Sequence, residues 1–271
     1  MDRTPEEVKL ICAVAISSSK KEVLYLRWRL VELEELGARE AMALEEVVME
    51  QVSEGGDPVI HFWKWREKAV TIGSFQIAED EVYLDRARKM GVPVIRRVSG
   101  GGTMFHVPGG EFVYSLCAPP GVIMTDITAS YRQLLGPIVD ALIDLGLDPA
   151  MIENNIMIGD RKISGSAQRR MASAILHHGT LLHDVNQFEM FSMIKGDKAP
   201  SHTRGVCSNY KPVTCILDHL DMNLDSVYEK VRDRILTDMD WYLSNWSEEE
   251  RYRAMEIGSQ KYSREDWNLK L

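Results

Sequence analysis

The sequence predicts an α+β fold. Segments with the alternating or continuous apolar pattern of strands are interspersed with segments whose apolar residues recur at helical spacing. These segments do not follow the strict strand–helix alternation of a doubly wound parallel sheet. No internal repeat is present, and no stretch rich in proline, glycine or serine divides the chain. With 271 residues, of which 45% are hydrophobic and 27% charged, the composition is that of a globular protein with a substantial core.

Strands are predicted where short apolar runs end at turn residues. The turn at Gly159-Asp160 separates two of them, Pro119-Pro120 closes another, and the strands over residues 59–65 and 68–72 are expected to form a hairpin. The predicted strands cover residues 25–33, 59–65, 68–72, 92–98, 112–118, 155–158, 162–166 and 175–182.

Helices are predicted where apolar residues recur every three or four positions. Gly91 and Gly146 follow two of these segments and suit the left-handed position after a helix, while the turn over residues 55–58 ends the first helix. The predicted helices cover residues 35–52, 79–90, 128–145, 186–193, 224–244 and 247–257. Residues 1–22 are expected to form a helical or partly disordered extension.

The charge and cysteine content exclude several classes of protein. A net charge of −9 and a pI of about 5.4 argue against nonspecific binding to nucleic acid, which requires a basic face. No apolar run reaches the ~20 residues needed to span a bilayer, and no convincing signal peptide is present, so we expect neither a membrane nor a nucleic-acid partner. The cysteines lack metal-ligand spacing, which predicts buried, reduced thiols in a cytoplasmic protein. They are Cys12, Cys117, Cys207 and Cys215.

The segment over residues 96–106, RRVSGGGTMFH, is the most informative part of the chain. Three consecutive glycines allow the backbone to approach a ligand closely because they lack a Cβ. The arginines before them can bind an anion in a forked geometry. The segment therefore predicts a loop that wraps an anionic small molecule, although a glycine-rich hairpin turn with solvated arginines is the structural alternative.

A second segment, residues 154–183, contains Lys162 between the Gly159-Asp160 turn and a run of small residues, followed by HHGTLL. With both segments together, the chain resembles the lipoate–protein ligase family. The family's strongest signatures are an RRxSGGG loop that ends in histidine, and a G-x-[KR]-K-[IV]-S-G-[SN]-A run followed by HHGTLL. Weaker blocks also match, and the resemblance extends from about residue 24 to the C-terminus. These blocks lie at residues 41–46, 70–76, 203–206, 213–214, 261–262 and 267–268.

The resemblance implies a mixed sheet flanked by helices, like the catalytic domain of biotin ligases, in a single catalytic domain over residues 23–271. It also implies an ATP-dependent lipoate–protein ligase. Such an enzyme activates lipoate to lipoyl-AMP with loss of pyrophosphate and passes the lipoyl group to one lysine of an acceptor protein. The expected small molecules are ATP, Mg²⁺ that accompanies the nucleotide, and lipoate as the substrate.

Lys162 is the predicted catalytic residue. A site that forms an acyl-adenylate holds a carboxylate close to the α-phosphate, so a cation is needed at the reacting centre. A compact ammonium on a flexible stem can bridge a carbonyl oxygen and a phosphate oxygen. The resemblance points to the same residue. A solvated cation in a turn is the alternative, and it suits the neighbouring Arg161 better.

The glycine loop is expected to bind the nucleotide. Adjacent strand residues face opposite sides, so we expect only one of Arg96 and Arg97 to reach the ligand, with Arg97 the better candidate for phosphate contact. Met104 and Phe105 also fit core positions, and His106 fits a structural role equally well. The residues predicted to bind ATP or lipoyl-AMP are Arg96, Arg97, Gly100, Gly101, Gly102, Thr103, Met104, Phe105, His106, Asn154, Asn155 and Lys162.

The acyl group is expected near His178-Gly179, where a glycine makes space for an apolar tail. Where the family has an aspartate that helps to hold Mg²⁺ or the nucleotide, this chain has the neutral Asn155, so no metal ligand is assigned and Mg²⁺ would enter bound to the ATP phosphates. The residues predicted to line the acyl pocket are Gly73, Ser164, Gly165, His178, Gly179 and Thr180.

The expected acceptors are apo lipoyl-domain proteins, namely the E2 subunits of 2-oxoacid dehydrogenases and the glycine-cleavage H protein. They are commonly acidic, so a local basic patch is expected, to which Arg169-Arg170 contributes unless it is simply a solvated pair. Two-domain ligases continue into an accessory domain after the Trp-Asn block. Here only three residues follow Trp267-Asn268, so a separate accessory ligase subunit is an expected partner.

Two other functions compete with the ligase. An octanoyltransferase of the same fold transfers an acyl group through a cysteine thioester, and relatives of that type place the cysteine shortly before the position of Asn154. Residues 144–155 contain no cysteine, and neither Cys117 nor Cys207 matches that position. A binding module without activation chemistry is disfavoured by Lys162 and the intact glycine loop. A biotin ligase is also disfavoured, because the glycine-rich arginine loop of those enzymes has a different sequence.

Overall fold

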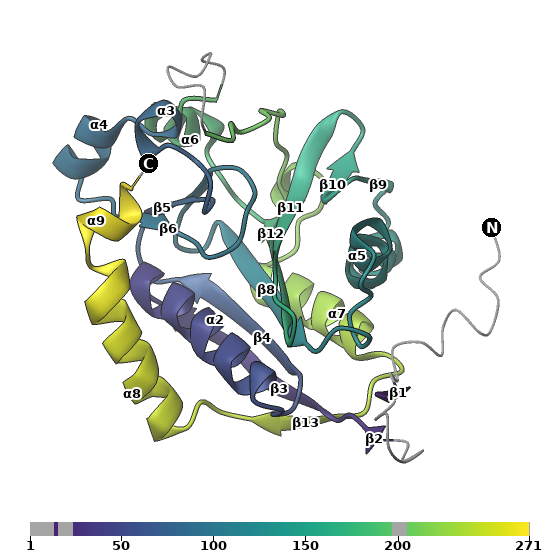
Figure 1. Cartoon of the computed structure of the whole chain (residues 1–271). Helices are drawn as coiled ribbons and strands as arrows, with labels where there is room; N and C mark the ends of the chain where they lie inside the picture. Colours follow the sequence, from purple (N-terminus) through teal and green to yellow (C-terminus); the bar gives the residue numbers. More distant parts are fainter. Residues whose placement is uncertain (1–13, 16–23, 197–204, 271) are drawn as a thin grey trace.

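An eight-stranded mixed sheet lies at the centre of the computed structural model, which describes residues 14–15, 24–196 and 205–270 (Figure 1). The strand order is β13-β3-β4-β8-β12-β11-β10-β9, with parallel pairing from β13 to β4 and antiparallel pairing in the remainder. The predicted α+β class with a mixed sheet is thus confirmed. The strands are β3 (Trp28–Leu36), β4 (Val59–Trp65), β8 (Glu111–Ala118), β9 (Pro149–Ile152), β10 (Asn155–Ile158), β11 (Arg161–Arg170), β12 (Ile175–Leu182) and β13 (Trp241–Ser244).

Helices cover both faces of this sheet. Helices α2 (Ala38–Ser53) and α8 (Glu248–Ile257) lie side by side on one face, and α5 (Ile127–Asp144) and α7 (Leu224–Leu236) lie on the other (Figure 1). Each face has its own apolar core. Because β8 and β12 are covered on both sides, every residue of these two strands is buried, which explains their near-continuous apolar sequence.

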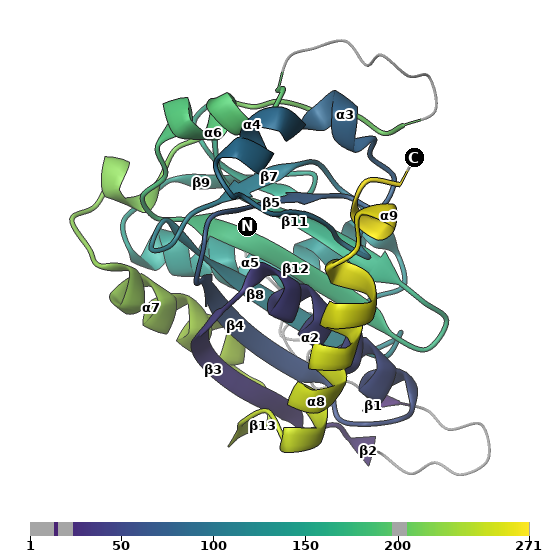
Figure 2. The same ribbon diagram turned by 90° about the vertical axis from the view of Figure 1, so that its left-hand side faces the viewer.

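A smaller sheet packs beside the large one (Figure 2). Its order is β6 (Val94–Arg96), β5 (Ala69–Ile72) and β7 (Met104–His106), and the glycine loop connects β6 to β7. A third apolar core joins this sheet to three short helices. These helices are α3 (Ala78–Glu81), α4 (Leu84–Lys89) and α6 (Gln187–Met193).

The predicted hairpin of residues 59–65 and 68–72 is wrong. Both segments are strands, but β4 pairs with β3 and β8 in the large sheet, whereas β5 pairs with β6 and β7 in the small one. The connection between them contains Glu67, whose carboxylate accepts a hydrogen bond from the amide of Ala38 at the start of α2 (2.8 Å). The chain therefore crosses from one sheet to the other at the point where it also caps a helix.

Two predicted helices are interrupted. The segment over residues 79–90 breaks at Val82, which is extended, fully buried and bridged to Ile194 at the end of α6. The segment over residues 224–244 remains helical only to Leu236, and its last four residues form β13, which pairs with β3. In both cases pairing with a distant segment outweighs the local helical pattern.

Other predicted boundaries agree within a few residues. Strand β12 coincides with its prediction, and α8 begins after Ser247, whose side chain caps it. Gly91, Gly146 and Gly159 have positive φ, as their turn positions require. Strand β3 extends through Leu36, so α2 begins three residues later than predicted.

Most of the predicted extension over residues 1–22 lies outside the described residues. The two residues that are described, Val14–Ala15, form β1 and pair with β2 (Leu24–Tyr25) rather than extending a helix. Near the other end, a π-helical turn η3 (Gly258–Tyr262) and α9 (Glu265–Asn268) follow α8. None of the described helices is long and apolar enough to cross a membrane.

Candidate functional site

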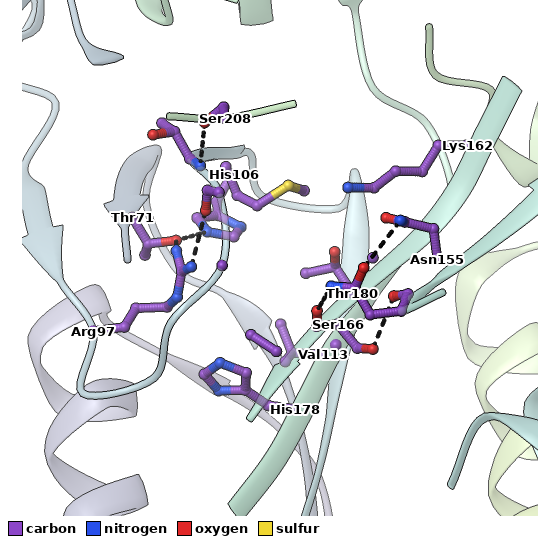
Figure 3. A pocket seen from close by; sticks show the side chains of 18 of the residues that line it. Thr71, Arg97, His106, Val113, Asn155, Lys162, Ser166, His178, Thr180 and Ser208 are labelled. Carbon is purple, nitrogen blue, oxygen red and sulfur yellow. Dashed lines mark hydrogen bonds between the residues drawn. The ribbon is translucent and has the colours of Figure 1, made fainter. Parts of the chain in front are cut away.

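A cavity of about 180 Å³ lies between the large sheet and the small one. Strands β11 and β12 contribute Lys162 and His178 to one wall, and the glycine loop and β7 contribute Arg97 and His106 to the other (Figure 3). The buried end is apolar, and the mouth is bordered by exposed residues of the glycine loop, the β9–β10 turn and the segment after residue 205. The lining of the buried end is Met42, Trp63, Trp65 and Val113.

Most residues predicted from the two motifs are brought together around this cavity, although the motifs lie about sixty residues apart. They are Arg97, Gly101, Gly102, Thr103, Met104, His106, Asn154, Asn155, Lys162, Gly165, His178, Gly179 and Thr180.

Five predicted residues do not line it. Gly100 offers its carbonyl to Arg97, and Phe105 points into the small-sheet core while its neighbour Met104 faces the cavity. Gly73 supports the loop from behind, since a Cβ there would lie 2.1 Å from the carbonyl oxygen of Gly101. Ser164 is hydrogen-bonded to the hydroxyl of Tyr114 (3.0 Å). The fifth predicted residue outside the lining is Arg96.

Arg96 is fully buried and serves the C-terminal segment. Its guanidinium donates to the carbonyls of Gln76 (2.6 Å), Lys270 (2.5 Å) and Trp267 (3.2 Å). Arg97 turns to the opposite side and lines the cavity, as expected for adjacent residues of an extended segment.

Arg97 holds the glycine loop rather than presenting free donors to the cavity. Its Nη2 donates to the carbonyls of Gly100 and Gly102 (2.9 Å each), its Nη1 to Thr71 Oγ1 (2.8 Å) and its Nε to Ser99 Oγ (3.3 Å). Four of its five N–H donors are therefore engaged. Burial lowers the pKa of this guanidinium to about 10, so it remains charged at neutral pH.

Lys162 places a cation in the cavity, and no acidic side chain of the described residues pairs with it. Among the residues that the structure describes, no acceptor bonds to its ammonium, and burial, Lys211 and Arg97 together lower its pKa to about 8. Its main chain is fixed by a distant segment, since its amide donates to the carbonyl of Pro212 (2.8 Å) and its carbonyl accepts from Thr214 (3.0 Å). This pairing also brings Lys211 to the cavity.

The two strand glycines make room for different groups. A Cβ on Gly165 would lie 2.4 Å from Lys162 Nζ, so this glycine accommodates the lysine. A Cβ on Gly179 would lie 2.2 Å from the hydroxyl oxygen of Tyr114. Gly179 therefore accommodates a core tyrosine on the opposite side of the strand, and its backbone also lines the cavity.

The asparagines at the turn between β9 and β10 are tied to the strand edge. Asn154 donates to the carbonyl of Ser166 (2.5 Å) and Asn155 donates to Asn154 Oδ1 (3.1 Å). Within the described part of the chain, no cluster of three histidine, cysteine or acidic side chains is arranged to hold a metal ion. Among the described lining residues, Glu153 supplies the one carboxylate, and it is exposed. The side chains thus suit an anionic ligand, and any divalent ion would depend on oxygens of the ligand.

The two cavity histidines have both ring nitrogens engaged. His106 contacts Glu111 through Nδ1 (2.5 Å) and Thr71 through Nε2 (2.8 Å), and its ring stacks on Trp65. His178 contacts Glu45 through Nδ1 (2.5 Å) and Ser99 through Nε2 (2.8 Å). Of the two roles left open for His106, the structure favours the structural one.

Sequence motifs missed two groups of cavity residues. The apolar end comes from helix α2 and from one face of β4, where Trp63 and Trp65 alternate with core residues of the other face. The mouth includes Ser208, Asn209 and Lys211. An alternating aromatic strand indicates a buried face but not a ligand, and the hints of the mouth were the weak blocks at residues 203–206 and 213–214, which flank it.

The cysteines and the Arg169-Arg170 pair can now be placed. Cys117 and Cys215 are buried free thiols, as predicted, but Cys207 is exposed, because its segment runs over the surface; Cys12 lies outside the described residues. Arg169 is exposed, whereas Arg170 donates to the carbonyls of Met124 (2.9 Å) and Thr125 (2.7 Å), so only Arg169 is free to serve a partner.

Comparison with known proteins agrees with this geometry. Residues 37–237 match the family model of the lipoyl protein ligase A/B catalytic domain. Lipoate-protein ligase A subunit 1 of Thermoplasma acidophilum is 28% identical over 90% of this chain and 97% of its own length. The octanoyltransferase LipM of Anoxybacillus flavithermus is 25% identical over 90% of this chain and 98% of its own length.

Solved structures show the same architecture. A T. acidophilum lipoate protein ligase with bound lipoic acid superimposes with a TM-score of 0.77 at 28% identity, covering 91% of this chain and 100% of that one. A lipoate-protein ligase A bound with ATP gives 0.76 at 28% identity over 90% and 99% of the two chains. A structure from work on an archaeal lipoylation system, a bi-partite lipoate protein ligase and its E2 lipoyl domain from T. acidophilum, gives 0.77 at 28% identity over 90% and 96%.

Proposed function

The chain belongs to the family of lipoyl protein ligase A/B catalytic domains, and on that basis we propose that it is the catalytic subunit of an ATP-dependent lipoate–protein ligase. The observation that carries the proposal is the Lys162 ammonium, which has no acidic partner among the described residues and lies in a cavity whose far end is apolar. A carboxylic acid with an apolar tail, held next to a phosphate, matches both ends of that cavity.

The reaction has two steps. In the first, a carboxylate oxygen of lipoate attacks the α-phosphorus of ATP, and the bond to pyrophosphate breaks. In the second, the deprotonated amine of an acceptor lysine attacks the carbonyl carbon, and AMP leaves with the electron pair of the broken bond. Mg²⁺, when present with the nucleotide, would neutralise phosphate charge.

Lys162 is suited to both steps. Two anions repel one another when they approach, and a desolvated ammonium between them offsets that repulsion more strongly than it would in water. In the second step the same group can stabilise the negative charge that develops on the carbonyl oxygen. Lys211, which shares the cavity, adds a second positive charge for the phosphates.

In the proposed mechanism the glycine loop supplies backbone contacts to the phosphates. The carbonyls of Gly100 and Gly102 are turned toward Arg97, so the amide of Gly101 points away from it, because carbonyl and amide of one trans peptide are antiparallel. No acceptor within the described residues bonds to that amide. A free glycine amide at positive φ is suited to a phosphate oxygen.

The partners follow from the relatives. The T. acidophilum relative is a bi-partite lipoate protein ligase that was studied with its E2 lipoyl domain. We therefore propose an apo lipoyl domain as the acceptor, with the glycine-cleavage H protein as a second acceptor of the same chemistry. We also propose a separate accessory subunit as a partner.

A thioester-forming transferase is the second candidate, because octanoyltransferases are among the relatives. That chemistry requires a cysteine thiolate at the acyl group. Of the cysteines that the structure describes, none lines the cavity, and burial raises the pKa of the Cys117 thiol well above its ordinary value. This supports the ligase over the transferase.

The deciding experiment combines the purified chain, an apo lipoyl domain and free lipoate, with Mg-ATP present or omitted, and reads the acceptor by intact mass. A lipoyl mass increase that requires ATP is the expected result. ATP-dependent lipoyl-AMP without acceptor modification would indicate a missing accessory subunit. Neither product, together with transfer from an octanoyl carrier protein, would overturn the ligase in favour of the transferase.

Lys162→Ala should abolish lipoyl-AMP formation while the protein stays folded. Arg161→Ala is the matched control, because Arg161 is the neighbouring exposed cation on the same turn, and this variant should behave like the wild type. Normal lipoyl-AMP formation by Lys162→Ala would refute the role assigned to Lys162.

A further inference from the structure

Two buried chains of hydrogen bonds meet at Arg97. Each begins at a buried glutamate, passes through a histidine and a hydroxyl, and ends at a different nitrogen of the guanidinium. We name them the first relay (Glu45–His178–Ser99) and the second relay (Glu111–His106–Thr71). Neither carboxylate touches the cavity, and no part of the two-step reaction above uses either of them.

The first relay joins three elements that are far apart in the sequence. Glu45 lies on α2, His178 on β12 and Ser99 at the start of the glycine loop, and the glutamate and serine are almost completely buried. Glu45 is 2.5 Å from His178 Nδ1, and Ser99 Oγ is 2.8 Å from His178 Nε2. The serine then accepts from Arg97 Nε (3.3 Å).

The second relay repeats the pattern from the other side. Glu111 on β8 is 2.5 Å from His106 Nδ1, and His106 Nε2 is 2.8 Å from Thr71 Oγ1 on β5. Thr71 accepts from Arg97 Nη1 (2.8 Å). The histidine ring cannot turn away, because it is stacked on Trp65 with 4.0 Å between ring centroids.

In both relays every hydrogen bond is donated in the same direction, from the guanidinium toward the carboxylate. A guanidinium only donates and a carboxylate only accepts, so each hydroxyl accepts from Arg97 and gives its own hydrogen to a histidine Nε2. Each histidine then carries its hydrogen on Nδ1 and donates it to its glutamate. Thr71 has no other acceptor among the described residues, and the alternative for Ser99, the Gly100 carbonyl, is farther away (3.5 Å).

This arrangement fixes the orientation of Arg97 from two sides. Its remaining engaged donors then hold the Gly100 and Gly102 carbonyls, which sets the direction of the loop amides. Polar networks buried in this way stabilise a fold less than packed apolar side chains do, but a chain of directional hydrogen bonds allows only one orientation.

We infer that the two relays are positioning devices that hold Arg97, and through it the glycine loop, in the orientation that receives the phosphates of the nucleotide. The inference rests on the proposed function. Their hydroxyl residues, Ser99 and Thr71, are the positioning residues, and Arg97 acts on the loop rather than as a forked grip on the phosphate.

Ser99→Ala tests the first relay, since it removes one oxygen from a buried residue that does not line the cavity. We expect kcat/KM for ATP in lipoate-dependent ATP–pyrophosphate exchange to fall roughly 10- to 100-fold, as misplaced contacts near the reacting atoms typically cause. The Kd for lipoate, measured by calorimetry without nucleotide, should stay within about twofold, because the loop contacts the phosphates and not the acyl tail.

Ser130→Ala is the matched control. Ser130 is a buried serine with several polar contacts on α5, away from the cavity, and its loss should leave kcat/KM for ATP unchanged. Thr71→Val, which keeps the side-chain shape, should reproduce the Ser99→Ala result. An equal weakening for ATP and lipoate, or no effect on ATP, would overturn the inference.

A second measurement is independent of activity. Long-range ¹⁵N–¹H spectra of the full chain without ligands, assigned with the two histidine variants, should show the ring hydrogen of His178 and of His106 on Nδ1 and none on Nε2. The Nε2–H tautomer or an imidazolium would overturn the relays. If the wild type performs no ATP–pyrophosphate exchange, the proposed function fails, and these spectra still decide whether the relays exist.

Discussion

The ammonium of Lys162 occupies the space that any side chain on Gly165 would require. An ideal Cβ at Gly165 would lie 2.4 Å from Lys162 Nζ and 2.5 Å from its Cε, and 3.4 Å from Asn155 Oδ1. The glycine of the strand motif thus has a specific function, which is to let the lysine fold back across the strand toward the cavity.

Gly165→Ala should therefore displace the ammonium without unfolding the protein, because a lysine end is flexible and can move. We expect lipoate-dependent ATP–pyrophosphate exchange to fall by about 100-fold, in line with the cost of moving a catalytic group by about 1 Å. Gly258→Ala is the control, since its nearest contact would be an ordinary 4.0 Å, and it should retain wild-type exchange. Unchanged exchange in Gly165→Ala would contradict the placement of Lys162.

The rate of adenylation should decline above about pH 8. Burial, Lys211 and Arg97 lower the pKa of Lys162 to about 8, so its positive charge is lost as the pH rises through that value rather than near that of a free lysine. The measurement is kcat/KM for ATP against pH in the free enzyme. Lys162→Arg keeps its charge, so whatever activity it retains should not show this decline. A wild-type profile that stays flat to pH 10 would argue against a cationic Lys162.

Replacing Lys162 should stabilise the fold at neutral pH. A lowered pKa in the folded state means that the charged form is disfavoured there, so its penalty is fully present below about pH 8 and disappears as the pH rises toward the unfolded value of 10.5. Lys162→Met should raise the free energy of unfolding by about 1–3 kcal/mol at pH 7 after allowance for partial exposure. Urea denaturation at pH 7 and pH 10 is the measurement, with Arg161→Met as the control. A gain of the same size at both pH values would show that packing, not charge, is responsible.

A larger side chain at the apolar end should restrict the cavity to carboxylic acids with shorter chains. Val113 lies at that end and is almost fully buried (Figure 3). In Val113→Phe, exchange supported by lipoate or octanoate should fall at least about tenfold, whereas exchange supported by hexanoate should fall less. Overpacking should also lower stability by about 1–3 kcal/mol, so cooperative unfolding has to be checked. An equal loss for all three acids would place the acyl tail elsewhere.

Local sequence patterns were enough to predict the α+β class, most strands and helices, and the two motifs that supply the cavity. Local patterns were sufficient for these because alternation, helical spacing and turn glycines depend only on neighbouring residues. Lys162 and the glycine loop were identifiable for the same reason, since each is part of a contiguous run with an unusual composition.

Which residues come into contact depended on the packing of distant elements. Strands β4 and β5, predicted to form a hairpin, pair in different sheets, and residues 241–244, predicted as helix, form a strand. In both cases hydrogen bonding to a distant strand outweighs local propensity. Contacts between distant elements also direct the Arg96 side chain away from the cavity and place Tyr114 against Gly179. The two relays that end at Arg97 draw on both sheets and helix α2, and no local pattern in the sequence indicates that Glu45 and Glu111 are connected to the same guanidinium. Contacts of this kind depend on packing between elements, which a single sequence does not specify position by position.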